Sequence, residues 1–451
     1  MSIGSGSGNE TAESLFIEAN ALEISKSHWK LPSKKQDSLL GSNWFKFLVV
    51  PLFAAFFGWL VVINGNGILH LRLLKVSSAV QKRCISVAKV AIVDAGSTAT
   101  RVHLYEFVMR GNNVHSLQHD HFVEEPIGLA SFAKNPQQAA EFIGKLLSSL
   151  HSGWRRRLLR IRKQRIPIVV RATAGLRLLA DDEAEELLSA IRSFLSNNSS
   201  IFYISQDSSV AMLSGSEECL FAWQAAHFLL PWLAAQKIAI VELGGASLQV
   251  AFEVSESNDE RLAILEVNGM PRTMYQNSFL GYGLMEARKL YERMNLSACE
   301  DATLGWNQCY KSIQQILNVD ALTEEELCGI SGVYQPKIEA GTQVLVFSYL
   351  NERIREAHGS LIDADWITLG HLQELVSTSC YRQEKKGKWW CFDITFAFAL
   401  LKDGMRLDAS QKIWPVKKAG EFEVCWCVGA ALQAVEAMEK EKARKRKLAV
   451  K

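Results

Sequence analysis

The chain has 451 residues, and 48% of them are hydrophobic. This length exceeds what one ordinary core accommodates and suits two domains with appendages, while the hydrophobic content excludes a chain that is disordered throughout. The formal net charge is only +2, so no overall basic field indicates a nucleic-acid partner, and none is expected.

The N-terminal region predicts a membrane anchor. Residues 1–43 are rich in Ser, Gly and charged side chains and predict a flexible cytosolic tail. In the next segment, 44–64, the run from Phe47 to Ile63 is apolar throughout, which is the short end of the roughly 17–25 residues of a transmembrane helix. The run begins too deep in the chain for a cleaved signal peptide, and a buried core helix is the alternative.

The charges beside this run predict its orientation. Lysines before it slightly outweigh the basic residues after it, which favours a cytosolic N-terminus. No second apolar run of this length occurs toward the C-terminus. We therefore predict a single-pass type II membrane protein, with a stalk at 65–85 and the remaining residues in the Golgi or ER lumen or at the cell surface.

Beyond the stalk, strand and helix patterns alternate, which predicts an α/β fold. Val87–Asp94 is a β-branched run typical of a buried strand, and Arg101–Phe107 alternates like its hairpin partner. Ile166–Thr173 predicts another strand and Ala184–Leu195 an amphipathic helix. The basic stretch Trp154–Arg165 is interpreted as the solvated end of a surface helix, because no nucleic-acid motif accompanies it.

An internal repeat is the most informative feature of the sequence. Lys89–Gly96 reads KVAIVDAG and Lys237–Gly244 reads KIAIVELG, so five of eight positions are identical at an offset of 148 residues. Each copy predicts a buried strand that ends in a carboxylate, then a tight turn of glycine and small residues, then an alternating strand. Two ordinary hairpins are the alternative, but two copies in register favour a shared function.

Such turns suit phosphate, because backbone N–H groups converge where Gly, Ser and Ala let the backbone approach closely. The strand-end carboxylates, Asp94 and Glu242, can hold a divalent cation that bridges phosphate oxygens. Two such turns facing each other across a cleft would clamp a polyphosphate from both sides. The predicted phosphate-binding residues are Gly96, Ser97, Thr98, Gly244, Gly245, Ala246 and Ser247.

The duplicated strand–turn–strand resembles the superfold of actin and Hsp70, which is built from two ribonuclease H-like domains. Within that superfold, four segments resemble the apyrase (nucleoside triphosphate diphosphohydrolase) family. They are DAGSTATR at Asp94–Arg101, ATAGLRLL at Ala172–Leu179, LSGSEECLFAW at Leu213–Trp223 and VELGGASLQVAF at Val241–Phe252. The resemblance implies two ribonuclease H-like lobes facing a central cleft, at 86–235 and 236–435, followed by a charged tail at 436–451.

The resemblance also implies a catalytic base. Phosphoanhydride hydrolysis needs a positioned water, neutralised charge and a base within hydrogen-bond reach of that water. Glu217 and Glu218 are adjacent in a segment that we expect to begin a helix capped by Ser214 or Ser216. By resemblance Glu218 is the base; the alternative is that both glutamates are acidic first-turn residues favoured by the helix dipole.

The remaining implied roles concern the water and the cation. Thr173 and Gln249 resemble the family positions that help orient the water. The implied cofactor is Ca²⁺ or Mg²⁺, with Asp94 and Glu242 holding it through water. Arg177 lies in a family motif, and we expect it to serve in structural pairing.

Two departures from the family pattern bear on activity. Glu242 stands in place of the commoner Asp, which preserves the charge and adds a methylene group. Cys219 replaces the Gly after the base, and a positive φ there would be costly for a residue with a Cβ. A catalytically impaired pseudo-hydrolase that acts as a membrane scaffold is therefore one alternative, and an exopolyphosphatase-like hydrolase of the same superfold is another.

The C-terminal half carries fewer signals. By resemblance, a nucleobase stacks on an aromatic side chain; Tyr349 lies in a comparable segment, and Trp389 and Trp390 are also available. The cysteine spacing of the family implies two disulfides, Cys309 with Cys328 and Cys380 with Cys391. Glycosylation sequons fit a lumenal or extracellular face, and they occur at Asn197, Asn198 and Asn295.

Together these features predict metal-dependent hydrolysis of the terminal phosphate of nucleoside di- and/or triphosphates by a glutamate-activated water. The expected substrates are ATP, ADP, UDP or GDP. By resemblance, a natural role is a Golgi nucleoside diphosphatase that clears UDP or GDP after glycosyl transfer, and an extracellular apyrase is the other.

Overall fold

The computed structural model describes residues 85–449, apart from the short stretches 159–164, 199–200, 234, 256–258, 268–269, 301–304, 319–328, 362–364 and 381–385. The predicted tail, the predicted transmembrane segment and all but the last residue of the predicted stalk lie outside the described residues. Within them, no helix combines the length and the apolar character that crossing a bilayer requires.

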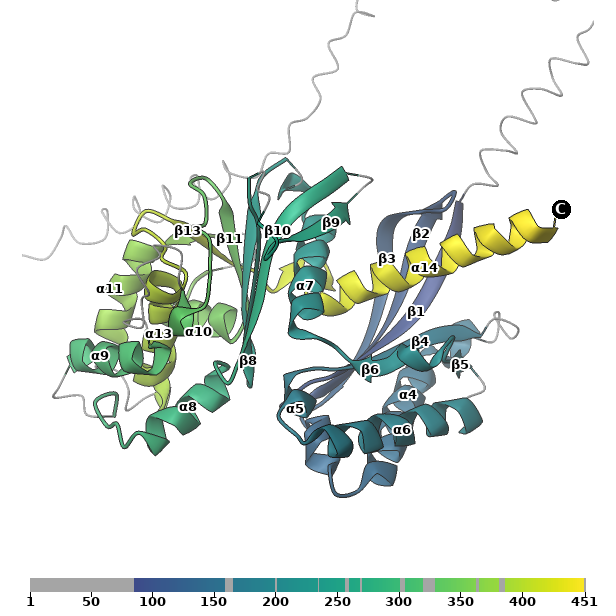
Figure 1. The fold of residues 1–451 in the computed structure, drawn as a ribbon, viewed down its shortest axis with the longest axis horizontal. Helices are drawn as coiled ribbons and strands as arrows, with labels where there is room; N and C mark the ends of the chain where they lie inside the picture. Colours follow the sequence, from purple (N-terminus) through teal and green to yellow (C-terminus); the bar gives the residue numbers. More distant parts are fainter. Residues whose placement is uncertain are drawn as a thin grey trace, which may run out of the picture. The chain divides into compact units, whose positions relative to one another are not determined.

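Two mixed β-sheets form the framework of the described residues (Figure 1). In the first, the strand order is β3-β2-β1-β4-β5, with β6 beside β4. Its strands are β1 (Ile85–Ala95), β2 (Thr100–Arg110), β3 (Asn113–Glu125), β4 (Ile166–Ala172), β5 (Phe202–Tyr203) and β6 (Val210–Met212). β1 is antiparallel to β2 and parallel to β4, so the predicted hairpin and the next predicted strand both form.

The second sheet repeats this arrangement. Its order is β12-β13-β11-β7-β8-β10-β9, with β7 antiparallel to β8 and parallel to β11. Its strands are β7 (Ile238–Leu243), β8 (Ser247–Glu253), β9 (Ala263–Val267), β10 (Met270–Leu280), β11 (Gln343–Ser348), β12 (Ile367–Thr368) and β13 (Lys412–Pro415). A small separate hairpin consists of β14 (Lys418–Ala419) and β15 (Phe422–Glu423).

The registers of the two central hairpins are the same. Asp94 lies opposite Arg101 in the first, and Glu242 lies opposite Gln249 in the second. Each residue of the second pair follows its counterpart in the first by 148 residues, which is the offset of the sequence repeat. The duplication that the sequence predicts is therefore a duplication of strand pairing, and each copy ends its first strand with a carboxylate.

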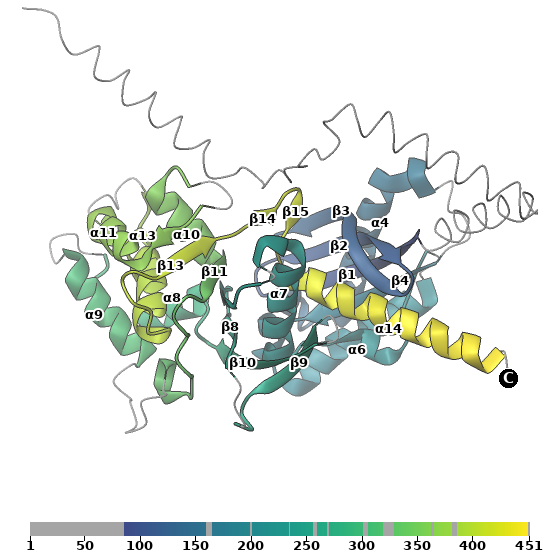
Figure 2. The ribbon, with the colours of Figure 1, turned by 90° about the horizontal axis from the view of Figure 1, so that it is seen from above.

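Helices cover the sheets and connect their strands. Their bounds are α4 (Pro136–Leu158), α5 (Ala174–Arg177), α6 (Asp181–Asn198), α7 (Gly215–Leu229), α8 (Leu284–Arg293), α9 (Gly305–Leu317), α10 (Tyr349–His358), α11 (Leu369–Ser379), α13 (Trp390–Ala399) and α14 (Trp426–Ala449). The α6 sequence has acidic residues in its first turn, where the helix dipole favours them. Figures 1 and 2 show α4 and α6 beside the first sheet, and α8, α9, α10, α11 and α13 beside the second.

Side chains along the central strands point alternately to the two faces of the sheet, and this divides the core into layers. In β1, Ala91 and Val93 face the helices α4 and α6, whereas Val90 and Ile92 face the opposite side. Successive side chains of a strand point to opposite faces, so a strand that is apolar throughout is buried on both. The second side leads into a core that residues of both sheets share with α7 and α14. The two predicted lobes thus contribute to one common core.

The C-terminal helix α14 belongs to this shared core. It packs on α7 and β1 (Figure 2), and Val428, Ala431 and Val435 are fully buried there. All strands of the first sheet precede the predicted lobe boundary at 235/236, and all strands of the second sheet follow it. The charged tail that was expected from 436 continues α14 as a helix to Ala449.

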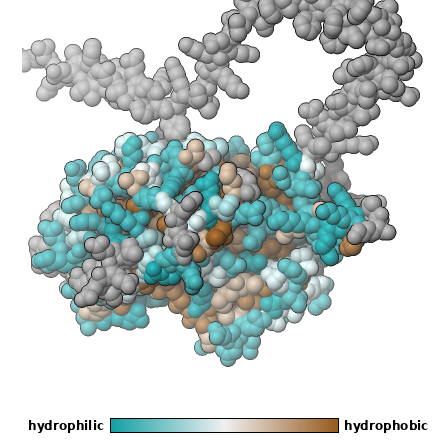
Figure 3. All heavy atoms as spheres, turned by 45° about the horizontal axis from the view of Figure 1, so that its top comes forward, coloured by the Kyte–Doolittle hydropathy of each residue, from teal (hydrophilic) through white to brown (hydrophobic). Residues whose placement is uncertain are grey.

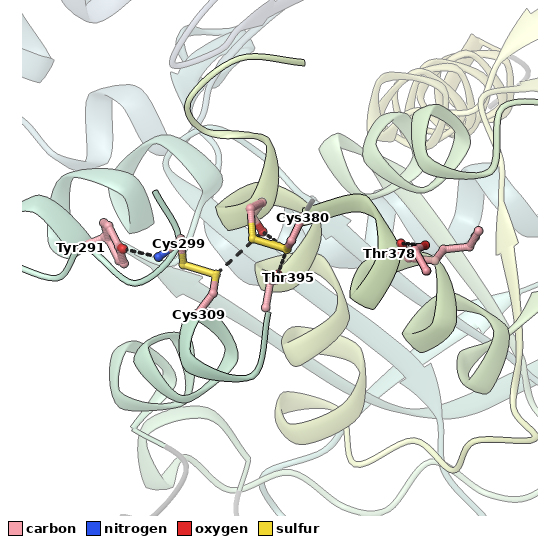
Figure 4. The surroundings of a disulfide bond; sticks show 8 residues. Tyr291, Cys299, Cys309, Thr378, Cys380 and Thr395 are labelled. Carbon is pink, nitrogen blue, oxygen red and sulfur yellow. Dashed lines mark hydrogen bonds between the residues drawn. A yellow bond between two sulfur atoms is a disulfide. The ribbon is translucent and has the colours of Figure 1, made fainter. Parts of the chain in front are cut away.

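Two disulfides lie among the segments beside the second sheet (Figure 4). The predicted bond between Cys380 and Cys391 forms. The predicted partner of Cys309 is wrong: Cys309 is bonded to Cys299, whose Cα lies 4.4 Å away. The other predicted member of that pair, Cys328, lies outside the described residues.

The surface contrasts with these buried layers. On the face shown in Figure 3, hydrophilic residues predominate and hydrophobic ones form small areas between them. This is the expected outcome of burying apolar side chains on both faces of two sheets.

Candidate active site

The two predicted phosphate-binding turns meet directly. A Cβ added at Gly245 would lie 2.9 Å from the Oγ of Ser97 and 2.9 Å from the Cγ2 of Thr98. A contact this short forces a neighbouring group to move, so only glycine fits at position 245 without a shift. The turn after β1 is equally crowded, because a Cβ at Gly128 would lie 2.2 Å from the carbonyl oxygen of Ser97.

The strand-end carboxylates lie in the cavity that both turns line. Asp94 accepts a hydrogen bond from Arg101 at 3.4 Å, and Glu242 accepts one from the hydroxyl of Ser348 at 3.0 Å. Burial raises the pKa of Asp94 above its ordinary value and raises that of Glu242 to about 7. The charges of Glu242 and Asp94 also raise the pKa of Glu218, which lines the same cavity.

The first turn of α7 places the adjacent glutamates Glu217 and Glu218 in different surroundings. Ser214 is the N-cap: its side chain accepts a hydrogen bond from the backbone of Glu217 at 3.2 Å, and the Glu217 side chain accepts from the backbone of Ser214 at 3.1 Å. This capping box holds Glu217 at the helix end. Glu218, one residue later, is buried and lines the cavity. The expected Ser214 cap is confirmed.

Glu218 is surrounded by polar partners. It accepts a hydrogen bond from the Nη2 of Arg177 and one from the Nε2 of Gln249 at 3.3 Å. Burial raises the pKa of the Glu218 carboxyl to about 8, and the Glu242 and Asp94 charges add to this while Arg177 opposes it. A carboxyl whose pKa lies near neutral pH is suited to accept and release a proton.

The other two predicted catalytic residues line the same cavity. Gln249 is fully buried on β8 and also donates to the hydroxyl of Ser247. Thr173 follows β4 directly, where its backbone N–H donates to Ala95 at 3.2 Å. Thr173 is buried, and no side-chain cap hydrogen bond holds it at the start of α5. The structure thus brings Thr173, Glu218 and Gln249 together from three separate segments.

The cavity has a volume of about 520 Å³. Every predicted catalytic, phosphate-binding and metal-holding residue lines it, and so does Tyr349 at the start of α10. Trp389 and Trp390 are not among its lining residues, whereas other aromatic side chains are: Phe122, Phe347 and Trp426. Another hollow, of about 610 Å³ between 337 and 412, contains none of the predicted site residues.

Several cavity residues carry no signal in the sequence. Ser348 holds Glu242 from a left-handed conformation, with φ of 54°, which is uncommon for a residue with a Cβ. Ser348 is the counterpart of Ala172 in the first sheet. Ala172 pairs with the residue after Asp94, and Ser348 pairs with the residue after Glu242. Lys417 and Lys418 also line the cavity, but they lie outside any motif. Only the parallel pairing of β11 with β7 identifies Ser348.

The concern about Cys219 is removed by the structure. The residue lies within α7, is fully buried and does not have a positive φ. Its thiol donates to the carbonyl oxygen of Asn277 at 3.1 Å. Burial raises the pKa of this thiol, which keeps it protonated and unreactive. The Cβ beside the predicted base is therefore accommodated by ordinary helix geometry.

The strand-end carboxylates fit a divalent cation. Asp94 Oδ1 and Glu242 Oε2 are buried and have no hydrogen-bond partner among the described residues. Leaving such oxygens unpaired is costly, and carboxylate oxygens are the ligands that Ca²⁺ and Mg²⁺ prefer. The donor set therefore suits either ion, bound directly or through water.

Comparison with known proteins agrees with this geometry. The sequence profile of the GDA1/CD39 (nucleoside phosphatase) family matches residues 85–305 and 298–451. The chain is 29% identical over 418 residues to a guanosine-diphosphatase of Schizosaccharomyces pombe, covering 76% of this chain and 73% of that protein. It is 26% identical over 392 residues to ectonucleoside triphosphate diphosphohydrolase 5 of Gallus gallus, covering 76% and 87%.

A solved structure has the same fold. The nucleoside triphosphate hydrolase structure from Neospora caninum superposes with a TM-score of 0.58 at 13% identity, covering 84% of this chain and 97% of that one. The sequence profile spans both sheets and α14. The chain therefore belongs to the GDA1/CD39 (nucleoside phosphatase) family.

Proposed function

We propose that this protein hydrolyses the terminal phosphate of nucleoside di- and/or triphosphates with a water molecule that Glu218 activates. One observation carries the proposal: a buried glutamate with a raised pKa faces the same cavity as two glycine turns and two strand-end carboxylates. The guanosine-diphosphatase and ectonucleoside triphosphate diphosphohydrolase relatives support nucleotide substrates.

In the proposed reaction, the two turns cradle the phosphates through backbone N–H groups, with Ser97, Thr98 and Ser247 adding hydroxyl donors. Glu218 accepts the proton of the attacking water as the water adds to the terminal phosphorus. Thr173 and Gln249 hold that water in line with the bond that breaks. Phosphate and the shortened nucleotide are the products.

Ca²⁺ or Mg²⁺, held by Asp94 and Glu242 through water, would neutralise charge on the phosphate oxygens. Tyr349 begins α10 at the edge of the cavity, and we assign it the stacking contact with the nucleobase. Such a contact tolerates different bases, because every base has an aromatic face.

The compartment is part of the proposal. Two disulfides among the described residues favour an oxidising environment. With the apolar run Phe47–Ile63, they support a type II protein anchored in a secretory-pathway membrane or at the cell surface. There, hydrolysis of UDP or GDP would clear the product of glycosyl transfer.

Phosphate release from the purified full-length chain tests the proposal. ATP, ADP, UDP, GDP and inorganic polyphosphate are compared with Ca²⁺, with Mg²⁺ and with EDTA. Wild type should release phosphate from at least one nucleotide in a metal-dependent manner. Glu218→Gln should lower kcat by roughly 10²- to 10⁴-fold, the usual contribution of a general base.

Glu217→Gln is the matched control, since Glu217 caps the helix and should leave turnover near the wild-type value. Faster release from polyphosphate than from every nucleotide would favour the exopolyphosphatase-like alternative. A folded wild-type protein that binds nucleotide but releases no phosphate would reject hydrolysis in favour of the scaffold.

A further inference from the structure

A second cluster of side chains that could bind a metal, formed by His103, Cys425 and Cys427, lines the same cavity. His103 is on β2, Cys427 lies in the first turn of α14, and Cys425 directly precedes that helix. One ligand atom from each of the three residues lies within 4.8 Å of the others. Both cysteines are free thiols, and neither they nor His103 takes part in the proposed hydrolysis.

The histidine ring is oriented as a metal ligand. Its Nδ1 is 3.1 Å from both carboxylate oxygens of Asp120 on β3. That pairing leaves Nε2 as the available nitrogen, and Nε2 is buried without a hydrogen-bond partner among the described residues. His103 itself is only 1% exposed. A carboxylate that holds one ring nitrogen while the other faces a metal is the usual outer shell of a histidine ligand.

The surroundings suit two sulfur ligands. The hydroxyl of Tyr105 lies 3.6 Å from the Sγ of Cys425, within reach to donate to a thiolate. Tyr105 also stacks on the ring of His103, with centroids 5.2 Å apart, and Phe122 packs against that ring at 4.8 Å. These ring contacts hold the imidazole in place.

We propose that His103, Cys425 and Cys427 bind one Zn²⁺ ion through one imidazole nitrogen and two thiolate sulfurs. Zinc takes sulfur ligands at about 2.3 Å and imidazole at about 2.0–2.1 Å in a tetrahedral arrangement. That geometry places ligand atoms roughly 3.5–3.8 Å apart. The three ligand atoms already lie within 4.8 Å of one another, so they need to approach only slightly. The fourth position faces the cavity, which all three residues line, and takes water.

Charge also favours this ion. Two thiolates neutralise the two positive charges of Zn²⁺, so the buried complex carries no net charge from these groups. The soft sulfur atoms distinguish this site from the oxygen ligands of Asp94 and Glu242, which suit Ca²⁺ or Mg²⁺. The inference does not depend on the proposed hydrolase activity.

Titration of the full-length chain with Co²⁺, a spectroscopic substitute for Zn²⁺, tests the site. The protein is stripped of metal, reduced with a phosphine and kept in excess Mg²⁺ to occupy the oxygen site. One equivalent of Co²⁺ should produce an intense thiolate-to-cobalt charge-transfer band and tetrahedral visible bands. Zn²⁺ should abolish both, and should raise the thermal unfolding midpoint because it joins β2 to the start of α14.

Three variants make the test specific. Cys425→Ser with Cys427→Ser should remove the charge-transfer band, whereas Cys219→Ser, which removes another buried free thiol, should retain it. Asp120→Asn keeps all three ligands and should weaken Co²⁺ binding about 10- to 100-fold, which tests the site even if the double serine variant fails to fold. Absence of the band in wild type, or an equal band in the double variant, would overturn the proposal.

Discussion

Glu218 is distinguished from its neighbour by one position on a helix. The capping box uses Glu217 at the helix end, and the next side chain turns into the cavity beside Arg177 and Gln249. Burial, two nearby carboxylates and one guanidinium then act on a single carboxyl group. The balance of these effects has consequences for both activity and stability.

The first prediction concerns stability and pH in the metal-free protein. The pKa of Glu218 is raised from 4.5 to about 8 by burial, so between these values the folded protein holds a proton that the unfolded chain has released. Its contribution to the free energy of unfolding therefore falls as the pH rises through this window. Glu218→Gln has no carboxyl at this position and should not show this fall. As the pH rises, the free energy of unfolding of the variant should therefore increase relative to that of wild type.

Urea unfolding in EDTA, measured for both proteins from pH 5 to pH 8, checks this prediction. A constant difference between the two proteins across that range would contradict it.

The second prediction concerns the pH dependence of turnover. Arg177 lowers the pKa of Glu218, against the stronger effect of burial. Removing its charge in Arg177→Met should move the acidic limb of kcat/KM to higher pH, because the base must be deprotonated to accept a proton. Arg192→Met is the control, since Arg192 pairs with exposed Glu185 outside the cavity. An acidic limb of kcat/KM at the same pH in wild type, Arg177→Met and Arg192→Met would argue against Glu218 as the base.

At the scale of elements, close backbone approach positions the site. α7 carries Glu218, and α14 packs on α7 where a glycine removes the side chain between them. A Cβ at Gly429 would lie 2.2 Å from the carbonyl oxygen of Phe221. Backbone cannot yield as a flexible side chain can, so α14 and α7 pack this closely only with glycine at position 429. The start of the same helix brings Cys427, and Cys425 just before it, close to His103 on β2.

The third prediction therefore concerns Gly429→Ala. Alanine normally stabilises a helix interior relative to glycine by about 1 kcal/mol. Here the clash with Phe221 should instead lower the free energy of unfolding by about 1–3 kcal/mol. Gln433→Ala, at an exposed position of the same helix, should change it by less than about 0.5 kcal/mol. Chemical denaturation of both variants measures the difference, and a more stable Gly429→Ala would refute the packing argument.

For the described residues as a whole, one core is assembled from distant parts of the sequence. Residues of both sheets meet α7 and α14 in a common layer, so the C-terminal helix completes packing that begins at β1. The two predicted lobes are therefore not independent in stability. The cavity lies where this shared layer brings the two hairpins face to face.

The fourth prediction separates the buried part of α14 from its exposed end. Truncation after Glu436 removes a charged and largely exposed segment and should leave the unfolding midpoint near the wild-type value. Truncation after Cys425 removes Trp426, Val428, Ala431 and Val435, which are buried. Each large apolar side chain contributes about 1.5–3 kcal/mol, so their combined loss is comparable to the whole stability of a domain, roughly 5–15 kcal/mol.

Soluble yield and thermal unfolding of the two truncated proteins measure this difference. A cooperative transition in the shorter protein at the wild-type temperature would show that α14 is dispensable.

The sequence by itself determined the two hairpins, the turns of glycine and small residues, the strand-end carboxylates and the capped helix that bears Glu218. These features follow from strand alternation, turn composition and capping, which act over a few residues and are visible in any single segment. The tertiary structure decided the partner of Cys309, the helical setting of Cys219, the place of α14 in the shared core and the contacts of Ser348 and His103. Each of these depends on which distant segments touch, and contact between distant segments depends on how whole sheets and helices pack.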